Sequence, residues 1–190
     1  MRVLLINGSQ KTNGDTHQSL MTVETLMKAK GVEADVFHIG SQMIRGCIEC
    51  DACRATNYCT FQNDPCNPLI DAIKEADGIV IGSPVYFGGP SGSVCSLLDR
   101  VFYATSHSNP LFAGKPAAAL VNCNVTGAAE ALDRLNNYFS YSQMPIVSCI
   151  NWTVDLMPDN DAETEVFEKQ SIKNMVENMY MLIKMKTSLK

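Results

Sequence analysis

RVLLINGSQKTNGDT, residues 2–16, is the stretch of sequence that decides the predicted fold. Its first six residues form a short apolar run that ends in Gly8-Ser9 and a polar loop. A helical pattern, with apolar residues recurring on one face, then covers 16–30. Strand, loop and helix in this order are typical of the first unit of a parallel α/β sheet.

The same alternation continues along the chain. Further apolar runs predict strands at 33–39, 78–82, 116–121 and 146–150, and helical patterns are found at 68–76, 93–103, 128–139 and 162–186. Continuous apolar strands separated by helices imply a parallel sheet covered on both faces by right-handed crossovers. We therefore predict an α/β fold, a three-layer doubly wound sandwich with a five-stranded parallel sheet of order 2-1-3-4-5. We expect residues 1–190 to form a single domain.

Composition and charge narrow the class of protein. The chain has 190 residues, 46% of them hydrophobic, which is enough for one domain with a sizeable core. A net charge of -5 without a Lys/Arg run argues against nucleic acid or anionic lipid as the main partner. No signal-peptide pattern opens the sequence, and no stretch approaches the roughly 18 apolar residues of a membrane span. We expect a cytoplasmic protein with no membrane partner.

The loop after the first strand predicts a phosphate site. Ligands of such sheets bind beyond the carboxyl ends of the strands, where the strand order reverses. GSQKTNGDT, residues 8–16, offers hydroxyls, backbone N–H groups and one cation at the start of a helix. It matches neither G-x-x-x-x-G-K-[ST] nor G-x-G-x-x-G, so a monophosphate is favoured over a dinucleotide or a triphosphate. The alternative is a plain loop with a Thr or Asp helix cap.

Two further loops predict the rest of this site. SPVYFGGP, residues 83–90, places two aromatic residues between a proline and glycines, an arrangement that favours stacking against a flat ring. The alternative is that Tyr86 and Phe87 are buried under the next helix. The loop at 122–127 follows the fourth strand, and we assign Asn122 and Asn124 to the far side of the ring, the alternative being a helix cap.

These loops together resemble a known family. Residues 8–16 resemble the phosphate loop GSPRxNGNT, and SPVYFGGPSGSVCSLLDR, residues 83–100, resembles the flavin-ring loop and helix of the NADPH-dependent FMN reductase branch of the flavodoxin superfamily. The segment from KPAAALVNC through YSQMPIVSCINWTVD, residues 115–155, is similar too. The resemblance implies a flavodoxin-like fold and FMN as cofactor, with no side chain acting as nucleophile or general base. It implies FMN contacts from Ser9, Lys11, Gly14, Asp15, Thr16, Pro84, Val85, Tyr86, Phe87 and Gly88.

Two residues depart from the family pattern. Gln10 replaces the usual Pro, and Asp15 replaces the usual Asn. A carboxylate beside a phosphate is repulsive unless it points away or caps its helix. We therefore expect the affinity for FMN to be reduced.

Five of the eight cysteines fall within twenty residues, in a loop at about 45–66. The spacing C-x2-C-x2-C-x5-C is too compact for a two-part zinc ribbon and wraps readily around one cubane cluster. It resembles the motif of the iron-sulfur flavoproteins of the same family, which implies a [4Fe-4S] cluster held by Cys47, Cys50, Cys53 and Cys59. Zinc and unmetallated thiols remain alternatives, and Cys66 is either a thiol near the cluster or simply part of the loop.

The other candidate ligands have ordinary interpretations. Cys95, Cys123 and Cys149 stand singly in apolar surroundings and are predicted to be small core residues. The three histidines show no mutual metal-ligand spacing, so solvated or capping roles are expected for them. These are His17, His38 and His107.

The predicted function is that of an FMN-dependent oxidoreductase of the iron-sulfur flavoprotein kind. It would move electrons from a reduced donor, NAD(P)H or ferredoxin, to a small acceptor such as a quinone, a flavin or an oxygen species. One alternative is an NAD(P)H-dependent FMN or quinone reductase without a cluster, and another is a non-enzymatic electron carrier like flavodoxin. The resemblance also implies a homodimer or homotetramer in which a neighbour completes the flavin site.

Overall fold

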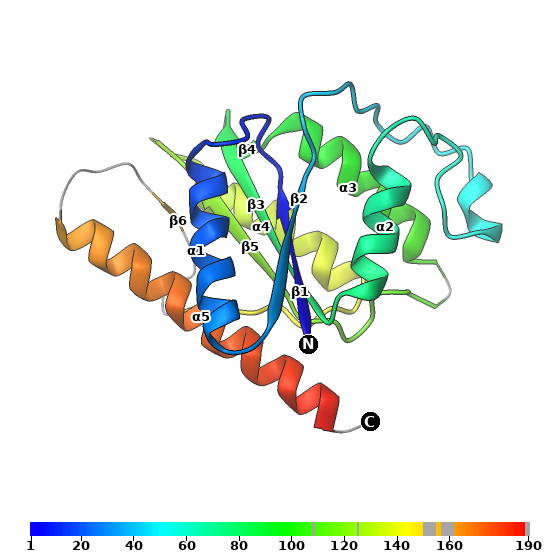
Figure 1. Cartoon of the computed structure of the whole chain (residues 1–190). Helices are drawn as coiled ribbons and strands as arrows, with labels where there is room; N and C mark the ends of the chain where they lie inside the picture. The colour runs from blue at the N-terminus through cyan, green and yellow to red at the C-terminus, as the bar shows by residue number, and fades with distance from the viewer. Residues whose placement is uncertain (108, 125, 150–154, 157–161, 189–190) are drawn as a thin grey trace.

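The computed structural model describes residues 1–107, 109–124, 126–149, 155–156 and 162–188, and it is built on a central sheet (Figure 1). The parallel strands lie in the order β2-β1-β3-β5-β6, so the first four places follow the predicted order 2-1-3-4-5 and the last is taken by β6 instead of the predicted strand at 146–150. Their bounds are β1 (Arg2–Asn7), β2 (Glu33–His38), β3 (Gly78–Tyr86), β5 (Ala117–Asn122) and β6 (Asp155–Leu156). The prediction of a doubly wound parallel sheet is confirmed.

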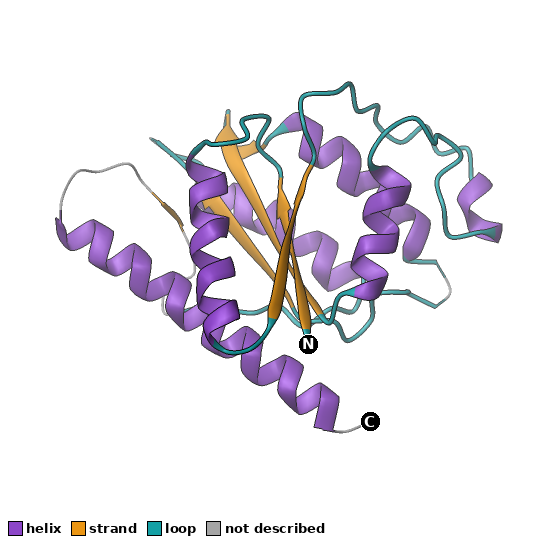
Figure 2. Ribbon diagram, viewed as in Figure 1, coloured by secondary structure: helices purple, strands orange, loops and turns teal. Residues whose placement is uncertain are grey.

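Helices cover both faces of the sheet, which gives three layers (Figure 2). One face carries α1 (Asp15–Ala29) and α5 (Ala162–Ser188), and the other carries α2 (Cys66–Glu75), α3 (Gly92–Thr105) and α4 (Ala128–Tyr141). In the part of the chain that is described, none of these helices is long and apolar enough to cross a membrane.

The alternation of side chains along β1 explains the two layers. Val3 and Leu5 join the core under α1 and α5, whereas Leu4 and Ile6 join the core under α2, α3 and α4. All four are at most 2% exposed, and burying each side chain contributes about 1.5–3 kcal/mol. Because both faces are apolar, β1 reads as a continuous run, as expected for a buried parallel strand.

The edge strand differs from its prediction at 146–150. Ile146 forms an isolated bridge with Ala117, and the edge position is next filled by β6, where Asp155 pairs with Val121. The two partners on β5 are four positions apart in the sequence, whereas the two on the edge are nine positions apart. An edge strand pairs on one side only and tolerates such an interruption. Residue 150 lies outside the described residues.

The third strand is longer than predicted and ends in a hairpin. β3 continues to Tyr86, and the two-residue strand β4 (Gly89–Pro90) pairs with it antiparallel. The turn residues Phe87 and Gly88 have φ of 50° and 78°. Positive φ at both central residues is the mark of the type I′ turn of tight hairpins. A non-glycine residue such as Phe87 rarely adopts it, and this conformation is concentrated at functional sites.

Candidate functional site

An open pocket of about 1120 Å³, here called the flavin pocket, lies across the loops that follow β1, β3 and β5. Pockets for drug-sized ligands measure about 300–1,000 Å³, so it has room for a flat cofactor. Every residue predicted to contact FMN lines it. These are Ser9, Lys11, Gly14, Asp15, Thr16, Pro84, Val85, Tyr86, Phe87, Gly88, Asn122 and Asn124.

The first loop carries the anion-binding chemistry of the flavin pocket. Gly14 is the N-cap of α1 and has no side chain to accept bonds, so the first N–H groups of the helix remain available to an anion. The Ser9 and Thr16 side chains sit deep in the loop, at 4% and 2% exposure. Ser9 Oγ accepts a hydrogen bond from the Lys11 N–H at 3.1 Å, which fixes the loop. Asp15 is exposed in the first turn of α1.

Hydrogen bonds tie this loop to the segment after β4. Ser91 caps α3 by accepting the Val94 N–H, and its hydroxyl donates to the Gly8 carbonyl at 2.9 Å. Gln10 Nε2 donates to Ser93 Oγ at 3.1 Å. The family proline at position 10 has no donor, so Gln10 gives this chain an additional link between the two loops. Hydrogen bonds therefore connect the loop after β1 to the start of α3, next to the flavin pocket.

The second loop presents aromatic rings to the solvent. Tyr86 is 57% exposed and Phe87 is fully exposed at the tip of the β3–β4 hairpin. The alternative in which both are buried under the next helix is wrong. Two exposed rings beside a pocket give a surface on which a flat ligand stacks.

The third loop closes the far side of the flavin pocket by a contact between two glycines. A Cβ on Gly127 would lie 2.5 Å from Gly88 Cα, and Gly127 has a φ of 98°. Only glycine satisfies both demands, so the loops after β3 and β5 meet here. Five residues that line the flavin pocket were not among the predicted FMN contacts. They lie between the predicted residues of each loop or just after them. They are Asn13, Cys123, Thr126, Gly127 and Glu130.

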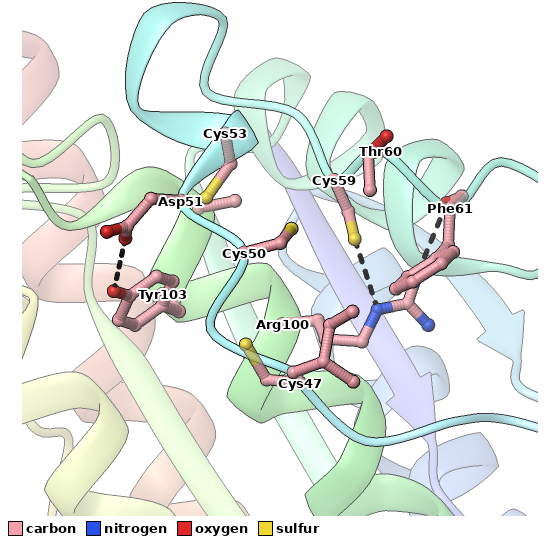
Figure 3. Close-up of a pocket in the computed structure, with 11 residues that line it drawn as sticks. Cys47, Cys50, Asp51, Cys53, Cys59, Thr60, Phe61, Arg100 and Tyr103 are labelled. Atoms are coloured by element: carbon pink, nitrogen blue, oxygen red, sulfur yellow. Dashed lines mark hydrogen bonds between the residues drawn. The ribbon is translucent and has the colours of Figure 1, made fainter.

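A second cavity, here called the cysteine cavity, gathers the four predicted ligands (Figure 3). Cys47, Cys50, Cys53 and Cys59 all line it, between residues 47–61 and α3. Sharp turns separate these cysteines, with positive φ at Glu49, Asp51 and Asn57. No residue lines both the cysteine cavity and the flavin pocket among those described. The remaining lining residues are Ile48, Asp51, Thr60, Phe61, Arg100, Tyr103 and Ala104.

Helix α3 and the residues after it directly contact residues 45–64, here called the cysteine segment. Tyr103 Oη donates to Asp51 Oδ1 at 2.7 Å, and His107 Nε2 lies 3.7 Å from Cys53 Sγ. The contact between His107 and Cys53 could not be predicted, because the two residues are 54 positions apart in the sequence. Burial raises the pKa of the Cys53 thiol, so a bound cation would have to offset that cost.

Cys66 belongs to the core. It is the first residue of α2, it is fully buried, and it does not line the cysteine cavity. Burial raises the pKa of its thiol to about 12. Cys66 is therefore part of the loop's support and remains a protonated thiol.

The four cysteines of the cysteine cavity are all potential sulfur ligands of a metal centre. Among the residues that the structure describes, no three or more His, Cys, Asp or Glu side chains converge to hold a metal ion. A zinc ion requires four ligand atoms around one point, whereas a cubane spreads its thiolates over four corners. Four cysteine sulfurs line one cavity, and this is the number of protein ligands that a cubane requires.

The strand order and a pocket at the point where it reverses define the flavodoxin-like class of α/β proteins. The family model of the NADPH-dependent FMN reductases matches residues 1–159, and the chain belongs to this family. It is therefore an FMN-dependent oxidoreductase.

Several curated relatives are iron-sulfur flavoproteins. One from Methanocaldococcus jannaschii is 29% identical over 154 residues, covering 77% of this chain and 76% of its own. One from Archaeoglobus fulgidus is 35% identical over 136 residues, which cover 70% of this chain and 66% of the relative.

Solved structures of flavoproteins share the fold. RosB, with the bound intermediate 8-demethyl-8-formylriboflavin-5'-phosphate, superimposes with a TM-score of 0.77 at 17% identity over 99% of this chain and 81% of its own. FerB, a flavoenzyme NAD(P)H:(acceptor) oxidoreductase from Paracoccus denitrificans, superimposes with a TM-score of 0.64 at 18% identity. The match covers 95% of this chain and 97% of FerB.

Proposed function

We propose that this chain is an iron-sulfur flavoprotein that passes electrons between FMN in the flavin pocket and a [4Fe-4S] cluster in the cysteine cavity. The observation that carries the proposal is the gathering of four cysteines around one cavity in a chain that also has the flavin pocket. The names of the relatives from Methanocaldococcus and Archaeoglobus support it.

Each loop of the flavin pocket has a part in this proposal. Ser9, Thr16 and the first N–H groups of α1 bind the phosphate, with Lys11 supplying a positive charge. Tyr86 and Phe87 hold the isoalloxazine ring, and Asn122 and Asn124 line its far side. Bound FMN supplies the conversion between two-electron hydride transfer and one-electron transfer. The protein's contribution is binding and orientation, without a nucleophile or a general base.

The proposal extends to partners and assembly. The donor is NAD(P)H or ferredoxin, and the acceptor is a small molecule such as a quinone, a flavin or an oxygen species. We propose a homodimer or homotetramer in the cytoplasm, in which the exposed Tyr86 and Phe87 rings are covered when a neighbour completes the flavin pocket.

A second candidate is an NAD(P)H-dependent FMN or quinone reductase without a cluster. Two observations favour it: burial raises the pKa of the Cys53 thiol, and the described ligand side chains do not converge on a metal ion. In that case the cysteine segment would be a surface loop with unmetallated thiols.

Anaerobic purification tests both candidates. We expect one FMN and about four irons and four labile sulfides per chain, with a broad visible absorption that dithionite partly bleaches. Full FMN without iron would establish the reductase without a cluster. Rapid bleaching of the flavin by NAD(P)H separates either enzyme from a carrier of the flavodoxin kind, which would react slowly.

The substitution Asp15→Asn should tighten FMN binding. Asp15 lines the flavin pocket and is exposed, so its carboxylate repels a phosphate dianion by about 1 kcal/mol at contact distance in water. We expect a several-fold lower FMN dissociation constant at low salt, and a smaller gain at high salt because screening weakens the repulsion. Fluorescence titration of FMN at several ionic strengths measures both.

Glu24→Gln is the matched control for Asp15→Asn. It removes one negative charge from α1 outside the flavin pocket, where Glu24 pairs with Lys28 at 2.8 Å. FMN affinity should not change. If Asp15→Asn instead weakens binding at every ionic strength, the Asp15 carboxylate caps the helix or binds the ligand.

A further inference from the structure

Arg100 of α3 is buried at the wall of the cysteine cavity. It is 2% exposed, and its guanidinium forms an ion pair with Asp64, whose side chain is 8% exposed. Buried charges are costly unless they are paired and their hydrogen bonds are satisfied. Arg100 lines the same cavity as the four cysteines, so we ask what its buried charge contributes there.

All five N–H donors of this guanidinium are used. Nε donates to Cys59 Sγ at 3.3 Å, and Nη1 donates to the Arg45 carbonyl at 3.3 Å and to Asp64 Oδ2. Nη2 donates to the Phe61 carbonyl at 3.2 Å and to Asp64 Oδ1 at 3.1 Å. Figure 3 shows the bond to Cys59 beside the other cysteines. The planar five-donor fork is particular to arginine, and a lysine has three donors on one atom.

The partners of Arg100 lie at both ends of the cysteine segment. Arg45 comes two residues before Cys47, and Phe61 and Asp64 follow Cys59. One side chain from α3 therefore fastens the start and the end of the loop to the same point. The fifth donor reaches the sulfur of the last predicted ligand.

We infer that Arg100 is a positioning residue of the cysteine centre, which clamps residues 45–64 and sets the reduction potential of the cluster through its bond to Cys59. This inference rests on the proposed iron-sulfur function. A hydrogen bond to a ligand sulfur, together with a nearby positive charge, stabilises the more negative, reduced form of a cluster. The bond therefore makes the cluster easier to reduce.

Arg100→Lys tests the clamp because it keeps the charge and removes the fork. Because lysine cannot replace all the charge-assisted hydrogen bonds to this segment, backbone hydrogen exchange across 45–64 should accelerate about tenfold or more. The comparison is made on metal-free and on iron-loaded protein. FMN content and exchange in β1 should be unchanged, and the cluster's midpoint potential should become more negative.

Arg134→Lys is the matched control. Arg134 donates to Asp99, the neighbour of Arg100 in α3, and it lies outside the cysteine cavity. Exchange across 45–64 and the midpoint potential should stay at wild-type values. Should Arg100→Lys fail to fold, Asp64→Asn keeps Arg100 and should accelerate exchange in the same segment alone.

Three results bear on the inference separately. Unchanged exchange across 45–64 in Arg100→Lys overturns the clamp, and an unchanged midpoint potential overturns the effect on the cluster. If wild-type anaerobic protein holds FMN and no iron, the proposed iron-sulfur function fails. Exchange in that metal-free protein then still decides whether Arg100 clamps the segment.

Discussion

Replacing Cys53 by alanine is expected to abolish the iron and labile sulfide of anaerobically prepared protein and to leave FMN bound. Cys53 is the third of the four predicted ligands and lines the cysteine cavity, which shares no described residue with the flavin pocket. With one of four thiolates missing, a cubane loses the ligand of one corner. The measurements are iron and sulfide per chain, the visible spectrum, and FMN released on denaturation.

The matched control for this loss is Cys66→Ala. Cys66 is also buried and lies in the same region, but it does not line the cysteine cavity, and burial raises the pKa of its thiol to about 12. We expect lower stability and unchanged iron. Iron that survives in Cys53→Ala and disappears in Cys66→Ala would place Cys66 in the ligand set instead.

Removing the Ser9 and Thr16 hydroxyls together should raise the FMN dissociation constant by a factor of about 10² to 10⁴. Charge-assisted hydrogen bonds to phosphate contribute about 1.5–3 kcal/mol each. The double variant is Ser9→Ala with Thr16→Val, because a methyl of Thr16 packs beside Gly82 and valine keeps it. Equilibrium titration with FMN measures the change.

The control for this pair removes two hydroxyls from α1 outside the flavin pocket. Thr22 is half-buried and Thr25 is exposed, and each donates to a carbonyl one turn back in α1. Thr22→Val with Thr25→Val should leave the FMN dissociation constant unchanged. An equally unchanged constant in the Ser9 and Thr16 variant would refute the placement of the phosphate.

Local patterns in the sequence were sufficient to predict four of the five parallel strands and part of the lining of both pockets. The continuous apolar run of β1 required a strand buried on both faces, and its side chains do alternate between two cores. The loops after β1 and β3 meet because parallel strands bring their carboxyl ends to one edge. The four cysteines share one cavity because their spacing keeps them on one short loop.

Features that depend on long-range contacts could not be predicted in this way. Nothing in the sequence distinguishes Arg100 from the other residues of its predicted helix, because its partner Cys59 is 41 positions away. The position of β6 depends on pairing with β5, because the apolar run at 146–150 carries no information on where the edge chain returns. Phe87 adopts a backbone conformation that the propensities of phenylalanine disfavour.

The attachment of the cysteine segment has a consequence for the order of assembly in the cell. Helix α3 holds this segment mainly through side chains, and residues 45–64 form no strand of the sheet. A segment fastened in this way opens locally while the sheet stays folded. Small zinc domains, in contrast, are unfolded until their metal arrives. On the proposed iron-sulfur function, we expect the polypeptide to fold first and to receive iron and sulfide afterwards, so that a cluster damaged by oxidation would be replaced in the same molecule.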